Sequence, residues 1–134
     1  MDGVVIALVS IAAAVAAAGV GYRRFRARSM ATVSDEQFVH DYYAHHPTDA
    51  TSEAILGERN RIAKVLGLPP EKLAPQQNLR VLSERLTYLA DFSVAWNDLA
   101  DDAAQAREAG GLPPRQRPPL TIGEIVEDLL CGGS

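Results

Sequence analysis

The sequence has little cysteine and lacks the short motifs of the common catalytic folds. Cys131 is the single cysteine among 134 residues, so neither a disulfide nor a cysteine-based metal site can form within one chain. The chain has no glycine-rich phosphate loop, no nucleophile beside a base and no strand-like alternation of apolar and polar residues. We therefore expect an all-α protein that has no enzymatic activity of its own.

Positive charge is also scarce over most of the chain. Of 13 Lys and Arg, four lie in residues 23–28; of 17 Asp and Glu, all but Asp2 follow that cluster. The remainder carries nine basic and sixteen acidic residues, a balance of −7. An acidic domain disfavours nucleic acid as a partner and favours basic protein surfaces.

One long segment lacks charge altogether. Residues 4–22, VVIALVSIAAAVAAAGVGY, are nineteen residues without a charged side chain; as a helix they rise roughly 28 Å, close to the ~30 Å hydrocarbon core of a bilayer. A cleaved signal peptide is the alternative, but the preceding residues carry no basic group. The basic flank follows instead, which predicts an uncleaved anchor over residues 1–28 with its N-terminus outside. These flanking residues are Arg23, Arg24, Arg26 and Arg28.

Beyond the anchor the sequence predicts further helices. Residues 29–53 form a linker and a short helix that starts at Ser34, where a serine cap precedes two acids and Gln37. Apolar residues recur at helical spacing from Ser52 and stop at Gly67. Thr121 and Glu124 form another capping box before a last helix.

The segment from Leu79 to Ala109 contains neither glycine nor proline. Its small and apolar residues fall at alternating spacings of four and three, which predicts a helical stripe. The pattern fits either one long helix or two nearly continuous ones.

A histidine-rich stretch is the only cluster that resembles a catalytic or metal site. Two histidines and a carboxylate can hold a metal, but the spacing of five between His40 and His45 does not suit one helix face. Histidines near a helix C-terminus also interact favourably with the helix dipole. We therefore expect no metal here. The cluster comprises His40, Asp41, His45, His46 and Asp49.

Two blocks of the sequence resemble acyl carrier proteins. Residues 58–79, ERNRIAKVLGLPPEKLAPQQNL, resemble the first helix and following loop of that family, and residues 120–130, LTIGEIVEDLL, resemble its last helix. The resemblance implies a small acyl-carrier-like helical bundle over residues 54–131, followed by a tail at 132–134. Carrier proteins bear a 4′-phosphopantetheine arm on a serine at the start of their second helix.

The resemblance places Ser93 on that carrier serine, with Phe92 where the family has aspartate and Val94 where it has leucine. A modifiable serine should lie exposed at a helix N-terminus, where the dipole receives the phosphate. Ser93 instead falls inside the helical stripe, so we expect it to be structural and the domain to bind no cofactor.

These features predict a non-catalytic docking or regulatory module on the cytoplasmic face of a bacterial inner membrane. The partners expected are the lipid bilayer and a protein, such as a membrane enzyme or complex. Two alternatives stay open: a functional acyl or peptidyl carrier modified on Ser93, and a small assembly subunit that pairs through a long helix. Acidic residues that could meet a basic partner are Asp91, Asp98, Asp101 and Asp102.

Overall fold

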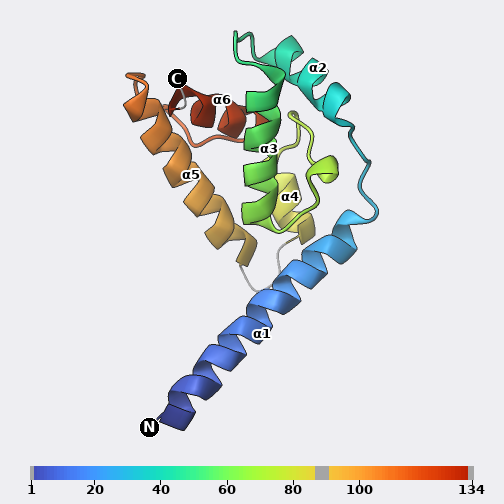
Figure 1. The fold of residues 1–134 in the computed structure, drawn as a ribbon, viewed down its shortest axis with the longest axis vertical. Coiled ribbons are helices and arrows are strands. Elements are labelled where there is room, and N and C mark those ends of the chain that lie inside the picture. The colour runs from blue at the N-terminus through green and yellow to red at the C-terminus, as the bar shows by residue number, and fades with distance from the viewer. Residues whose placement is uncertain (1, 87–90, 133–134) are drawn as a thin grey trace.

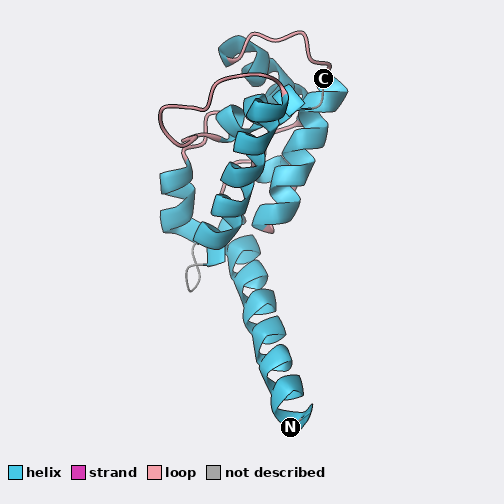
Figure 2. Cartoon of the chain, turned by 90° about the vertical axis from the view of Figure 1, so that its left-hand side faces the viewer, coloured by secondary structure: helices cyan, strands magenta, loops and turns pink. Residues whose placement is uncertain are grey.

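The protein is all-helical, as predicted. The structure, a computed structural model, describes residues 2–86 and 91–132 (Figure 1). Over these residues the helices, cyan in Figure 2, are joined by loops and by one isolated bridge between Asn78 and Thr121. The elements are α1 (Asp2–Ala27), α2 (Asp35–His45), α3 (Ser52–Leu66), the 3₁₀-helix η1 (Pro70–Lys72), α4 (Leu79–Leu86), α5 (Asp91–Ala109) and α6 (Ile122–Gly132).

The predicted helix starts are confirmed by their caps. The Ser34 hydroxyl accepts a hydrogen bond from the Gln37 amide at 3.1 Å, and that of Thr121 accepts one from the Glu124 amide at 3.2 Å. Each bond satisfies an amide that has no partner within the helix. Gly67 ends α3 at φ 70°, a left-handed conformation that favours glycine.

The stripe between Leu79 and Ala109 forms two helices that turn back on each other. Helix α4 ends at Leu86 and α5 begins at Asp91. Figure 1 shows that α5 runs back along the bundle from the end where α4 stops. One long helix is therefore excluded, and the two helices are not collinear.

The core lies where α3 and α5 meet α6, which crosses the ends of both (Figure 1). Helix α6 buries most of its residues, and each fully buried aliphatic side chain contributes about 1.5–3 kcal/mol. Helix α2 belongs to the same core, since Phe38 and Tyr42 are completely buried. The core residues of α6 are Ile122, Ile125, Val126 and Leu129.

A buried arginine fastens the entry of α2 to α3. Arg59 is 0% exposed, stacks on the Phe38 ring at 4.6 Å and pairs with Asp35 at 2.9 Å. It also donates to the carbonyls of Val33 and Leu73. Because the guanidinium has five donors in a fixed plane, one side chain can join three segments.

Helix α1 continues from its apolar part into a buried joint with the bundle. Over residues 4–15 the large apolar side chains are exposed. At the other end Ala27 is 0% and Met30 9% exposed, and both belong to the core. The Arg26 Nε donates to the Arg85 carbonyl at 3.2 Å, and Lys72 Nζ to the Met30 carbonyl at 2.9 Å. These contacts hold the end of α1 against α4 and η1.

Candidate functional site

Ser93 lies in the first turn of α5, not in the middle of a helix. It is the third residue of α5 as the structure describes it, and residues 87–90 lie outside the described part. The sequence pattern continues from Leu79 through Ser93, whereas α4 and α5 are separate helices; that Ser93 is structural stays a prediction. The side chains of Asp91, Phe92 and Ser93 lie outside the described part of the structure.

The acidic residues of α5 differ in their surroundings. Asp98 and Asp101 are exposed. Asp102 instead receives a hydrogen bond from Arg61 of α3, with Nη2 to Oδ2 at 3.2 Å. A basic partner would therefore have to compete with Arg61 for Asp102, while Asp98 and Asp101 remain accessible.

The arginines of the anchor flank also divide into two kinds. Arg24, Arg26 and Arg28 are exposed, whereas Arg23 is only 5% exposed. The first three can meet headgroups or water. Arg23 instead belongs to the joint between α1 and the bundle.

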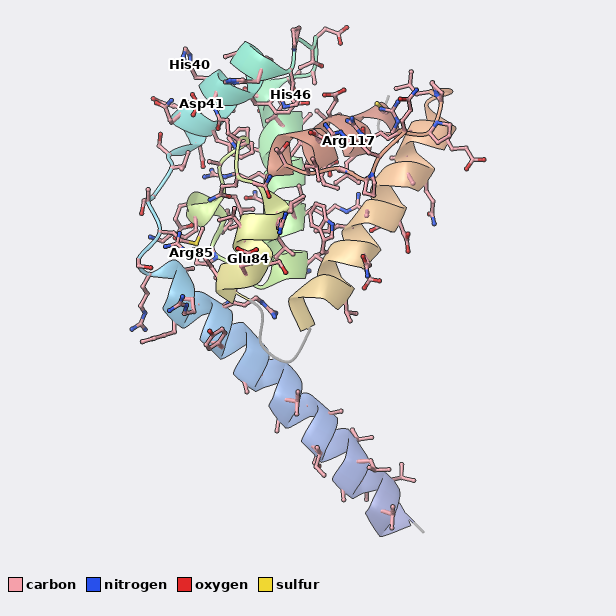
Figure 3. The ribbon with its side chains drawn as sticks, turned by 180° about the vertical axis from the view of Figure 1, so that it is seen from behind. His40, Asp41, His46, Glu84, Arg85 and Arg117 are labelled. Atoms are coloured by element: carbon pink, nitrogen blue, oxygen red, sulfur yellow. The ribbon has the colours of Figure 1, made fainter. Side chains whose placement is uncertain are left out.

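The histidines do not converge. His40 lies at the outer edge of α2, whereas His46 is turned toward α6 (Figure 3). The His45 ring contacts the Asp41 backbone carbonyl at 3.0 Å, as expected near a helix C-terminus. Across residues 2–86 and 91–132, no three His, Cys, Asp or Glu residues gather as a metal site would require.

A hollow with acidic residues in its walls lies between α3, α6 and the connection from α2 to α3. It measures about 720 Å³. Its walls include the carboxylates of Asp49, Glu58 and Glu127, and they include the Tyr42 ring. No lysine or arginine is among the residues that line it. The connection lies at the end of the molecule farthest from the start of α1 (Figure 1).

Two polar groups in the walls of this hollow lack hydrogen bonds. The Tyr42 hydroxyl and the Glu58 Oε2 are both buried, and neither bonds to another group of the described residues. Burial raises the pKa of the Glu58 carboxyl, and the charge of Arg61 partly opposes that rise. Burial likewise raises the pKa of Tyr42, with a further rise from the charge of Glu127. An unpaired buried polar group is unfavourable, so such groups need an explanation.

Glu127 differs from Glu58 because it already has partners. Its Oε2 lies 2.6 Å from the His46 Nδ1, and its Oε1 lies 3.8 Å from Arg115. Its backbone carbonyl accepts from the Cys131 thiol at 3.2 Å. Burial raises the pKa of that thiol, so Cys131 is not an activated nucleophile.

A second charged cluster holds the proline-rich loop against α6. Asp128 is 1% exposed and receives two hydrogen bonds from Arg115, at 2.7 and 2.8 Å, and one from Arg107 at 3.1 Å. Arg107 also donates to the Pro113 carbonyl. All the charges of this cluster have partners, which indicates a structural role.

Sequence reasoning missed Tyr42 and Glu58. Tyr42 belongs to α2 and Glu58 to α3, so no local motif joins them. The chain matches no protein family, no curated protein and no solved structure.

Proposed function

We propose that this protein is a membrane-anchored, non-catalytic helical module that docks a protein partner at the cytoplasmic membrane face. The observation that carries the proposal is the joint of α1. Residues 3–27 are long and apolar enough to cross a bilayer, and this helix runs directly into buried contacts at Ala27 and Met30. A signal sequence meant for removal would not need to contribute core residues to the mature domain.

The anchor is tested on the full-length protein in bacterial membranes. We expect it to resist alkaline carbonate extraction and to retain its N-terminal residues by intact mass. Protease added to the outer face should leave the bundle intact. Loss of the first residues by mass, or release by carbonate, would contradict the anchor.

Orientation is tested by reversing the charge of the basic flank. Arg24→Glu with Arg28→Glu removes the positive charge that retains this flank on the cytoplasmic side. We expect part of the population to expose the bundle to protease from outside. Arg80→Glu with Arg85→Glu, a change of equal charge within the bundle, should leave the orientation unchanged.

A functional carrier is the second candidate, favoured by the place of Ser93 in the first turn of α5. Amides at a helix N-terminus suit a phosphate group. The test is the intact mass after incubation with a broad-specificity phosphopantetheinyl transferase and coenzyme A. A gain of one pantetheine arm that is absent in Ser93→Ala supports the carrier function. No gain leaves the docking module.

The separation of α4 from α5 removes the feature that favoured an assembly subunit. A long continuous helix would have offered one uninterrupted pairing surface. The longest helix of the bundle is instead α5, which is packed against α6.

A further inference from the structure

The polar hollow has the chemistry of a site for a positively charged hydrogen-bond donor. Its lining holds three carboxylates and neither lysine nor arginine. Glu127 already has a hydrogen bond with His46 and lies near the charge of Arg115. Asp49 is exposed to bulk water. Glu58 is therefore the partly buried carboxylate whose hydrogen-bonding capacity is left over within the hollow.

Glu58 lacks a hydrogen bond at Oε2, although its side chain is only 22% exposed. The Arg61 Nη1 lies 3.8 Å from this oxygen, beyond hydrogen-bond distance. Arg61 is instead hydrogen-bonded to Asp102 at 3.2 Å. The carboxylate therefore has a free acceptor that bulk water reaches poorly.

Tyr42 provides an independent second group. Its side chain is completely buried, and its hydroxyl has no hydrogen-bond partner among the described residues. The ring is fixed by stacking on His46 at 5.0 Å and by an edge contact with Tyr43. A hydroxyl held in place without a partner is ready to accept a bond from a ligand donor.

We propose that this hollow receives the ammonium or guanidinium group of a lysine or arginine side chain presented by the partner protein. This inference rests on the proposed docking function and names the chemistry of the contact. Carboxylate acceptors in a partly desolvated site select a cation with several donors over an anion or an apolar group.

A protein side chain fits this hollow better than a free metal ion or small amine. About 720 Å³ is far more than one ammonium group fills, so a ligand must bring further atoms. No three potential ligands converge on a metal position among the described residues. The connection from α2 to α3, which lines the hollow, also lies at the end remote from the start of α1 (Figure 1), on the side that faces away from the proposed membrane.

The test measures binding of short labelled peptides to the full-length protein in phosphatidylcholine nanodiscs, whose neutral lipids do not attract basic peptides. One peptide carries a single arginine between glycines and serines, a second carries lysine, and a third carries neutral citrulline. We expect the arginine and lysine peptides to bind at least ten-fold more tightly than the citrulline peptide. Equal binding of all three, or no binding up to about 10 mM, overturns the proposal.

Three variants locate the site. Glu58→Gln should weaken arginine-peptide binding at least ten-fold, and Tyr42→Phe about five-fold. Gly57→Leu should abolish binding by filling the hollow, since a Cβ at Gly57 meets nothing within 4 Å and that residue lines the space. Glu84→Gln, an equal loss of charge on the exposed face of α4, should leave binding unchanged.

The control separates a built site from general attraction to an acidic surface. If Glu84→Gln weakens binding as much as Glu58→Gln does, the proposal fails. Carbonate extraction of each variant reports the anchor independently. If the protein stays in the membrane but does not bind the basic peptides, only the proposal for the hollow fails. If carbonate releases the protein from the membrane, the proposal of an anchored module fails.

Discussion

Two glycines in helices of this bundle have opposite surroundings. At Gly57 in α3 an added Cβ meets nothing within 4 Å, whereas at Gly123 in α6 it would lie 2.6 Å from the His46 Nε2 and 3.0 Å from the Pro75 carbonyl oxygen. Gly57→Ala should raise the free energy of unfolding by about 0.5–1 kcal/mol. Gly123→Ala should lower it by about 1–3 kcal/mol because the Cβ forces neighbours apart.

Urea unfolding followed by the fluorescence of Trp96, the single tryptophan, measures both changes. Trp96 packs against the core and so reports the bundle. If Gly123→Ala stabilised the protein, that result would contradict the close packing of α6 on His46 and on the loop that contains Pro75.

Glu58 should make the free energy of unfolding fall as the pH rises. A carboxylate paired with a cation has the opposite effect. Its pKa in the folded state is raised from the usual 4.5, so the folded protein binds this proton more tightly than the unfolded chain. The free energy of unfolding therefore falls as the pH rises from the usual pKa through the raised one. Below both pKa values Glu58 is protonated in the folded and the unfolded state, so the cost of burying its charge is absent.

Glu58→Gln should remove this penalty and stabilise the protein at neutral pH. Its advantage over the natural protein should grow as the pH rises from about 4 and then level off. Urea titrations across that range measure it. Glu84→Gln is the control, since Glu84 is exposed beside Arg80, and it should change the free energy of unfolding little. A destabilising Glu58→Gln would show that Glu58 has a structural partner.

At the scale of elements, Asp128 joins α6 to the end of α5 and to the proline-rich loop. Asp128→Asn leaves Arg107 and Arg115 without their shared carboxylate. Because the aspartate is 1% and the arginines are 14% and 23% exposed, we expect a loss of about 3 kcal/mol. Urea unfolding with Trp96 fluorescence tests it, and Asp98→Asn on the exposed face of α5 should change little.

The helices that local chemistry specifies were predictable from sequence, whereas the change of direction between α4 and α5 was not. Ser34, Thr121 and Gly67 act on neighbouring backbone groups, so their caps follow from a few residues. The division between Leu86 and Asp91 carries no glycine or proline. Helix α5 packs against α6, and such tertiary packing can override local periodicity.

The candidate hollow could not be predicted from the sequence, because it too depends on tertiary packing. Neither Tyr42 nor Glu58 departs from an ordinary helix pattern, and their missing partners become apparent only once α2, α3 and α6 are assembled. The acidic residues of α5 were visible as charges, but the engagement of Asp102 by Arg61 was not.

At the scale of the whole molecule, the joint between α1 and the bundle should affect stability far from the bilayer. Ala27 is completely buried there, whereas Ala14 is exposed on α1. Ala27→Leu should overpack the joint and lower the bundle's Tm by several degrees, while Ala14→Leu should leave it unchanged. Thermal unfolding in nanodiscs, monitored by Trp96 fluorescence, measures the Tm. If neither substitution changed the Tm, the bundle would fold independently of α1.

If α1 spans a bilayer as proposed, the same buried joint makes the orientation of the bundle sensitive to bilayer thickness. A spanning helix that is long for its bilayer tilts until its apolar length matches the hydrocarbon core. Because Ala27 and Met30 are buried in the core and fix the end of α1 to the bundle, a tilt of α1 rotates the bundle through the same angle. The parts farthest from the membrane then move the most, and these include the connection from α2 to α3 (Figure 1). In the proposed anchored module, a thinner or thicker membrane would therefore change where the bundle meets the proposed partner.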